Sequence, residues 1–471
     1  MQARVNDADG AVVEVWTGIQ VSWEMARGYP GAFGRSVNSP WIFIPLCLAF
    51  VAPFVDPRRP LRLLHLDLLV LLGFSVSHVF FNRGEIGASV PLVYPVLVYL
   101  LVRMLWAGFR PRTGAEGSAR PRTRGPLAPL VPVGALALML VFLVGFRVAL
   151  NVVDSNVIDV GYAGVIGADR IVHGQPLYEG AFPSENRTGD TYGPTAYLTY
   201  VPFELVLPWS GRWDDLPAAH AAAVVFDLLT ILGLFLMGRR VRAGPAGTAL
   251  GVALAYAWAA YPYTLFAMQS NSNDSLVAAA SIFALLAAGS APARGALAAV
   301  GGLAKFAPLA LAPLLAAGTG ERRTRSMVAF TLVFAAVCVA CVAPFVPDGG
   351  LSELFHRTIG SQLSRTSPFS VWGQVPGLQW AQRAVAALAV GLGVLVAFVP
   401  RRRTLAQVAA LGAAVLVLVE VAATHWFYLY VVWFAPFAFV ALLSEHATGE
   451  NEEQRPPVAA GRTSREPALS A

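Results

Sequence analysis

The stretch that organises this chain begins with NVVDSNVIDVGYAGVIGADRIVHG at residues 151–174 and runs from Asn151 to Trp213. It follows an uncharged apolar run, from Pro126 to Phe146, and a second membrane-length segment begins near Leu216. Carboxylates and aromatic rings are mixed within it, which suits a polar ligand with stackable faces, such as a sugar. Most loops are only a few residues long, so a polar loop of this size is usually functional; the alternative is a solvated spacer.

The composition is that of an integral membrane protein. Of the 471 residues, 56% are hydrophobic and 13% are charged, and several uncharged runs reach the length of about 20 residues that spans a bilayer. The formal net charge of +6 comes from arginine clusters at the ends of these runs. It therefore reports topology and gives no reason to expect nucleic acid as a partner. All three cysteines lie in apolar runs, so neither a disulfide framework nor a thiolate metal site is expected.

The arginine clusters predict the topology, because cytoplasmic loops concentrate basic residues. Five arginines lie in the linker from Arg110 to Gly125, which places this linker inside the cell. The loops from Asn151 to Trp213 and from Pro347 to Trp380 are then extracytoplasmic, and the carboxyl terminus is cytoplasmic. With about 20 residues per span, the sequence predicts an all-α, multi-pass cell-membrane protein of about eleven spans, among them Ile86 to Phe109 and Leu405 to Ala422. Before the first span, an amphipathic helix is expected around Val12 to Met25.

One segment breaks the alternation of inside and outside. Arginines on both sides of the stretch from Gly295 to Gly318 require the cytoplasm, so an even number of crossings or a re-entrant pair of half-helices is expected there. Gly301, Gly302 and Pro308 would supply the break. Lys305 lies between them and is the single lysine among 34 basic residues. All the other basic residues are arginine, so this lysine indicates either a site that needs a compact ammonium group or chance.

Several short motifs follow one another along the chain. They are Asp159-Val-Gly-Tyr162, Gly174-Gln-Pro-Leu-Tyr178 and Asp190-Thr-Tyr192-Gly193-Pro194 in the first external loop, then Gln269-Ser-Asn-Ser-Asn-Asp274, Gly302-Leu-Ala-Lys305-Phe-Ala-Pro308, Arg365-Thr-Ser-Pro-Phe-Ser-Val-Trp372-Gly373 and His425-Trp-Phe-Tyr428. In this order they resemble the GT-C superfamily of polytopic glycosyltransferases, and within it glycosyltransferase family 87, which uses polyprenyl-phosphate-mannose. The implied fold is a GT-C-type helical bundle with juxtamembrane helices in a large first catalytic loop.

The resemblance covers roughly Pro126 to Ser444 and divides the chain into three parts. Residues 1–125 form an amino-terminal extension with three transmembrane helices and the basic linker, residues 126–444 form the glycosyltransferase membrane domain, and residues 445–471 form a disordered cytoplasmic tail. GT-C enzymes typically carry the catalytic loop after their first span. Here three spans precede it, which is a departure from the pattern of the superfamily.

The resemblance implies inverting transfer of a sugar, usually mannose, from a polyprenyl-phosphate donor to a lipid, glycan or protein acceptor on the extracytoplasmic face. A loop carboxylate would be the general base; the pattern of the family maps it to Asp159, and Asp154 is the runner-up. The residues expected to bind donor or acceptor are Tyr162, Tyr178, Asp190, Tyr192, Asn273, Lys305, Arg357, Arg365, Trp372, His425 and Tyr428.

General chemistry adds to this assignment. A phosphate leaving group needs cations more than it needs an acid, so Lys305, Arg357, Arg365 and His425 are the phosphate candidates. Ionisable residues inside apolar segments are further candidates by default: His65, Asp67, His78, Asp227 and Glu420. The sequence requires no cofactor and leaves a divalent metal open. Two other readings remain: a transporter or lipid flippase for glycolipid precursors, and a scaffold whose aromatic loop binds a partner.

Overall fold

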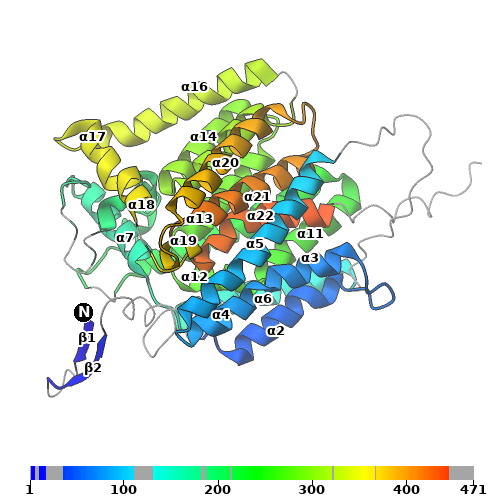
Figure 1. Cartoon of the computed structure of the whole chain (residues 1–471), viewed down its shortest axis with the longest axis horizontal. Coiled ribbons are helices and arrows are strands. Elements are labelled where there is room, and N and C mark those ends of the chain that lie inside the picture. Colours follow the sequence, from blue (N-terminus) through cyan, green and yellow to red (C-terminus); the bar gives the residue numbers. More distant parts are fainter. Residues whose placement is uncertain are drawn as a thin grey trace, which may run out of the picture.

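The computed structural model describes residues 2–5, 10–16, 36–110, 131–180, 182, 186, 188–212, 215–320, 323–365 and 367–444. These residues form a bundle of helices (Figure 1), together with one antiparallel hairpin of β1 (Gln2–Val5) and β2 (Val12–Trp16). The helix expected around Val12 to Met25 is wrong over its described part, because valines 12, 13 and 15 are β-branched and favour a strand. Beyond Arg110, the predicted linker lies outside the described residues, as does the predicted tail at 445–471.

The amino-terminal helices share one hydrophobic core with the rest of the bundle. They are α2 (Pro40–Val51), the 3-10 turn η1 (Ala52–Phe54), α3 (Leu63–Leu72), α4 (Phe74–Asn82) and α5 (Ile86–Phe109). Helix α5 packs along α21 (Leu405–Ala422), and α2 packs against α11 (Gly244–Ala260). The hydroxyls of Tyr256 and Tyr261 donate to the carbonyls of Ala49 and Leu71 at 2.8 and 2.7 Å. These helices therefore support the core around the later segments directly.

The first long loop is folded into short helices. After α6 (Val133–Val153) come α7 (Asp159–Val172), η3 (Gly189–Thr191), α8 (Thr195–Leu198) and α9 (Val201–Glu204). The apolar face of α7 packs on α8 and α9, and their aromatic rings make a second hydrophobic core, separate from the main one. The loop is therefore a packed unit in its described part.

The remaining helices complete the bundle. They are α10 (Pro217–Val241), α11, α12 (Pro262–Gln269), α13 (Asp274–Leu286), α14 (Ala291–Ala304), η4 (Ala307–Leu311), α15 (Ala312–Ala317), α16 (Arg323–Val342), η5 (Ala343–Phe345), α17 (Gly350–Phe355), the π-helical turn η6 (His356–Gly360), α18 (Ser361–Ser364), α19 (Val371–Gln374), α20 (Gln379–Phe398), α21, η7 (Tyr428–Tyr430) and α22 (Val431–Ser444). Figure 1 shows α21 and α22 in the middle of the bundle and α16 along one edge. The spans expected at Ile86–Phe109 and Leu405–Ala422 are confirmed as helices with these bounds.

Within the described residues, seven helices are long and apolar enough to cross a membrane. An eighth span results if α11 and α12, which meet at a 59° bend, count as one. The bend falls at Tyr261-Pro262, where proline lacks the N–H that would continue the helix. Four shorter apolar segments lie at Pro40–Phe54, Asp274–Leu286, Ala307–Ala317 and Tyr428–Ser444. The fold is that of a polytopic helical bundle.

The helical conformation is interrupted at Lys305. Helix α14 ends at Ala304, Lys305 is extended (φ −143°, ψ 136°), and η4 begins at Ala307. The expectation that Gly301 and Gly302 would supply the break is wrong, because both lie inside α14. Their small size serves packing instead: a Cβ on Gly302 would lie 2.3 Å from the side chain of Leu309. The chain can thus return closely along α14 after the break.

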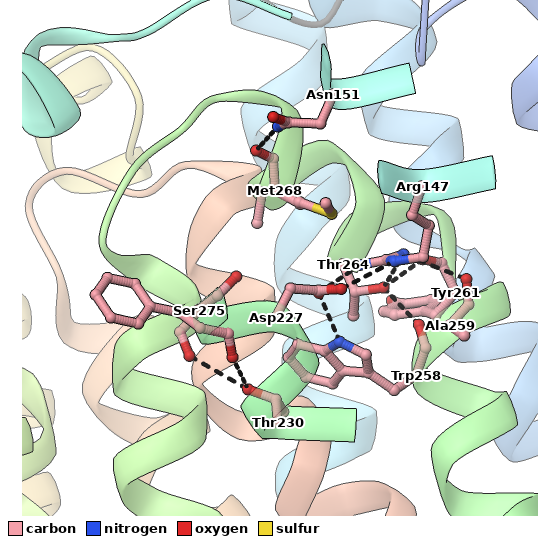
Figure 2. A network of polar contacts seen from close by, with 12 residues as sticks. Arg147, Asn151, Asp227, Thr230, Trp258, Ala259, Tyr261, Thr264, Met268 and Ser275 are labelled. Atoms are coloured by element: carbon pink, nitrogen blue, oxygen red, sulfur yellow. Dashed lines mark hydrogen bonds and ion pairs between the residues drawn. The ribbon is translucent and has the colours of Figure 1, made fainter. Parts of the chain in front are cut away.

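A buried ion pair joins α6 to α10 (Figure 2). The side chains of Arg147 and Asp227 are each 1% exposed, and Arg147 Nε donates to Asp227 Oδ2 at 3.0 Å. The indole of Trp258 donates to the same carboxylate at 2.8 Å, and Arg147 Nη1 donates to the carbonyl of Ala259 at 3.2 Å. The network therefore ties α6, the helix before the first loop, to the bend between α11 and α12. A second buried pair, Asp67 with Arg103, joins α3 to α5.

Candidate functional site

A cavity of about 770 Å³ lies where the first loop, the break at Lys305 and the segment before α22 meet. Five predicted site residues line it: Asp159, Tyr192, Lys305, Arg365 and His425. Other polar lining residues are Thr191, Asp274, Gln362, Gln382, Glu420 and Thr424. Much of the remaining wall is apolar, including one face of α20 formed by Ala386, Ala389, Val390, Gly393 and Val394. The cavity can therefore accept a ligand that has both a charged group and an apolar part.

Asp159 is placed by hydrogen bonds on both sides of its backbone. The N–H of Ile158 donates to the carbonyl of Ser270 at 3.1 Å, and the amide of Asn186 donates to the carbonyl of Asp159 at 2.8 Å. The carboxylate itself accepts the N–H of Val160 at 2.9 Å. A carboxylate in the first turn of a helix interacts favourably with the helix dipole, so the local sequence supports this position.

The turn before α13 fastens the first loop to the bundle. Asn271 has a left-handed backbone (φ 50°), which asparagine tolerates better than most residues. Its side-chain nitrogen donates to Ser155 Oγ and to the carbonyl of Asn156, both at 3.0 Å, and its oxygen accepts from Asn151 at 2.8 Å. Asn151 also donates to the carbonyl of Met268 at 3.0 Å (Figure 2). The segment between α6 and Asp159 is therefore held against the end of α12.

Three glycines at a spacing of three residues let α7 approach its neighbours closely. A Cβ on Gly161 would lie 2.1 Å from the carbonyl oxygen of Asn271. A Cβ on Gly164 or Gly167 would meet the ring of Tyr200 at 2.8 Å or of Tyr197 at 2.1 Å. Residues three apart share one helix face, so this pattern is visible in the sequence once the helix is known.

We expect Gly161→Ala to reduce both stability and any activity that depends on Asp159. The new methyl group would collide with backbone, which cannot rotate away, so α7 must shift; such overpacking costs about 1 to 3 kcal/mol. Thermal unfolding in detergent measures the stability. Gly145→Ala in α6 is the matched control, because nothing lies within 4 Å of its added Cβ. Equal melting temperatures for the two variants would contradict the close approach.

The surroundings make Asp159 a stronger base than an exposed aspartate. Burial raises the pKa of its carboxyl, and the nearby cations of Arg365 and Lys305 oppose that rise without cancelling it. The side chain is half-buried and faces the cavity. By contrast, Asp154 is exposed at the end of α6 and does not line the cavity.

Lys305 points its ammonium group at a second carboxylate. Its Nζ lies 2.5 Å from Oδ1 of Asp274, and its side chain is 10% exposed. Asp274 is fully buried and also accepts from Trp433 Nε1 at 2.8 Å and from Ser272 Oγ at 2.6 Å. Asp274 is thus held by three donors, whereas Asp159 reaches the cavity with a half-buried side chain.

Arg365 and His425 contribute differently to the cavity. Arg365 is exposed, and the structure gives it no ion pair with any described residue. Burial and the charges of Arg365 and Lys305 lower the pKa of His425 to about 3, so the imidazole is neutral at pH 7. The assignment of His425 to the donor phosphate stays a prediction. Its Nδ1 lies 2.8 Å from Ser367 Oγ, and a neutral ring can still offer one N–H to a ligand.

Other predicted residues lie outside the cavity. Tyr162 is buried and packs edge-on against Trp209, with ring centroids 6.0 Å apart. The hydroxyl of Tyr178 donates to the carbonyl of Tyr192 at 2.8 Å, so Tyr178 supports a lining residue from behind. The hydroxyl of Tyr428 lies 2.7 Å from Ser77 Oγ within the amino-terminal helices. In this conformation none of the three would touch a ligand in the cavity.

Arg357 and Asp190 pair with each other. Arg357 Nη1 lies 2.7 Å from Asp190 Oδ2, and its Nε donates to Glu353 at 2.8 Å. The pair links the loop between α6 and α10 to the segment between α16 and α20, and neither residue lines the cavity. Arg357 is therefore not among the cations that line the cavity, and its assignment to the donor phosphate stays a prediction.

Trp372 and Asn273 also lie away from the cavity. The indole of Trp372 donates to the carbonyl of Val421 at 2.8 Å. Asn273 is buried beside Asp274, and its amide has no hydrogen-bond partner among the described residues. Sequence reasoning chose Asn273 from this turn and missed Asp274. The missed signal was an aspartate at the start of an apolar helix, in a chain with few buried acids.

Within the described residues, no group of three or more His, Cys, Asp and Glu side chains could hold a metal ion. A scan against protein-family models and a search of curated proteins both found no match for this chain.

Proposed function

We propose that this chain is an inverting membrane glycosyltransferase that moves a sugar, mannose by the resemblance, from a polyprenyl-phosphate donor to an acceptor hydroxyl. The acceptor is a lipid, a glycan or a protein. The observation that carries the proposal is the cavity itself, in which a half-buried aspartate faces two cations beside an apolar wall. A lipid-linked sugar phosphate needs these three elements together.

The chemistry assigns a role to each element. Asp159 would remove the proton of the acceptor hydroxyl as its oxygen attacks the anomeric carbon from the face opposite the phosphate. The bond between the anomeric carbon and the phosphate oxygen breaks, and the phosphate leaves with the electron pair. Lys305 and Arg365 would stabilise the charge that develops on it. The apolar face of α20 would hold the start of the polyprenyl chain.

The topology is part of this proposal. A GT-C-type bundle of about eleven spans with a re-entrant pair at Lys305 would place the cavity at the extracytoplasmic face. In a cysteine-free background, we expect a membrane-impermeant maleimide added from outside to label Glu185→Cys and to spare Ala115→Cys. Labelling of residue 115 alone would overturn the proposed orientation.

The direct test of the activity is transfer of label. Membranes that contain the protein, supplied with radiolabelled polyprenyl-phosphate-mannose, should move the label to a new product and release polyprenyl phosphate. Membranes with the Asp159→Asn variant should do so far more slowly. If label remains on the donor in both, the glycosyltransferase proposal fails.

The alternative function is a lipid flippase or transporter. An apolar wall next to cations would also suit a lipid phosphate that is carried without being changed. A flippase predicts that a fluorescent polyprenyl phosphate crosses vesicles containing the purified protein while no label reaches an acceptor. Asp159→Asn would then leave translocation intact.

A further inference from the structure

We propose that Asp274 is a positioning residue, which holds the ammonium group of Lys305 toward the place where phosphate charge develops. The inference rests on the proposed function for the identity of that phosphate. Asp274 itself is not the base and need not touch the substrate. Its role is to fix where the ammonium group of Lys305 points, beside the break between α14 and η4.

The contacts of Asp274 are those of a fixed anchor. One oxygen, Oδ1, accepts both the ammonium of Lys305 at 2.5 Å and the indole N–H of Trp433 at 2.8 Å. The other, Oδ2, accepts the hydroxyl of Ser272 at 2.6 Å. Asp274 is 0% exposed at the start of α13, and Trp433 comes from α22. Two separate helices therefore determine where this carboxylate points.

Lys305 would otherwise be free to move. A lysine side chain is long and carries a point charge without the fixed fork of arginine. Its backbone lies at a break between helices, which restrains it less than a helix would. The ammonium also lies over the rings of Tyr430 and Trp433, at 5.7 and 5.4 Å from their centroids. The carboxylate and the two rings fix the position of the ammonium group. The remaining N–H donors of this group are available to a ligand in the cavity.

Removing the anchor should separate binding from turnover. In Asp274→Asn the cavity loses one negative charge, so binding of the anionic donor should not weaken, and its KM should stay level or fall. The cation is no longer aimed at the leaving phosphate, so kcat should fall by about tenfold. If Asp274 merely neutralised Lys305, the variant would keep or increase kcat. That outcome would overturn the proposal.

A double-mutant cycle with Lys305→Met separates positioning from a general structural role. If Asp274 acts through Lys305, adding Asp274→Asn to Lys305→Met should cause no further loss of kcat. A further loss of the same size as in the wild-type background would contradict the proposal. Trp433→Phe gives an independent variant, since it keeps a ring over the cation and removes only the donor to Asp274. It should lower kcat in the same direction, by less.

A readout independent of transfer uses the fact that Lys305 is the only lysine in the chain. Acetylation at residue 305 by an amine-reactive ester, followed by peptide mass spectrometry, should be about tenfold faster in Asp274→Asn than in wild type, because the amine loses a charge-assisted bond. Farnesyl phosphate should protect the wild-type residue, and farnesol should not. This measurement tests the proposal even if transfer is never observed. Equal acetylation rates of Lys305 in wild type and in Asp274→Asn would show that Asp274 does not hold the ammonium group, and a faster rate in the variant would support the proposal. Should Asp274→Asn fail to fold, the acetylation rate of Trp433→Phe takes its place.

Discussion

Replacement of Asp159 by asparagine is expected to lower kcat by about 100-fold or more, with the KM for the donor near that of wild type. Asparagine keeps the size of the side chain and can keep its bond to Val160, but it has no oxygen that can accept a proton. The loss should therefore appear in turnover. Steady-state kinetics of label transfer from polyprenyl-phosphate-mannose measure both constants.

Asp154→Asn is the matched control from the same loop. It removes the same charge at an exposed position at the end of α6, outside the cavity. We expect close to wild-type kinetics from it. If Asp154→Asn is inactive while Asp159→Asn is active, the base has been assigned to the wrong carboxylate. If both are active, the mechanism with a carboxylate base fails, and the flippase and scaffold readings become preferable.

The pH dependence follows from the raised pKa of Asp159. A base must be ionised to accept a proton, so activity should be present above the pKa of this carboxyl and should fall as the pH drops through it. Because burial raises this pKa, the fall should begin at a higher pH than for an exposed aspartate. A profile of kcat/KM whose acid limb lies in the ordinary aspartate range would contradict the buried environment.

Arg147→Met is expected to destabilise the protein by about 3 to 5 kcal/mol, because it leaves the carboxylate of Asp227 buried without its cation. The pair is 1% exposed on both sides. Thermal unfolding in detergent, together with the yield of monodisperse protein, measures the effect. Loss of the network in Figure 2 would also loosen α6, and α6 leads through Asn151 to Asp159.

Two controls accompany this prediction. Arg357→Met removes the cation of a pair whose arginine side chain is 31% exposed and whose aspartate side chain is 8% exposed, so its loss should cost less than the loss of Arg147, whose pair is 1% exposed on both sides. The double variant Arg147→Met with Asp227→Leu removes both charges and should recover most of the stability. A melting temperature for Arg147→Met as high as that for Arg357→Met would show that the buried pair is not the anchor of α6.

Helices could be predicted from local patterns in the sequence. Apolar runs bounded by arginine predicted the helices, including α5 and α21 with the observed bounds, because hydrophobic length depends only on neighbouring residues. The helix break near Lys305 was also predicted, since Pro308 interrupts an apolar run. Asp159 could be selected by its place after α6. The intramembrane acid Asp227 was recognised, whereas its partner Arg147 was not.

Only the tertiary structure decided which side chains meet in the cavity. Asp159, Lys305, Arg365 and His425 are far apart in the chain, and the same motifs that contain them also contain Tyr162, Trp372 and Tyr428, which do not line the cavity. Helix rotation and long-range hydrogen bonds determine which member of a motif faces the cavity. Neither can be predicted from the spacing of residues along the chain. The role of Asp274 needed this information most. Its partners Lys305 and Trp433 come from distant segments, and a buried carboxylate is stable only where such partners converge on it.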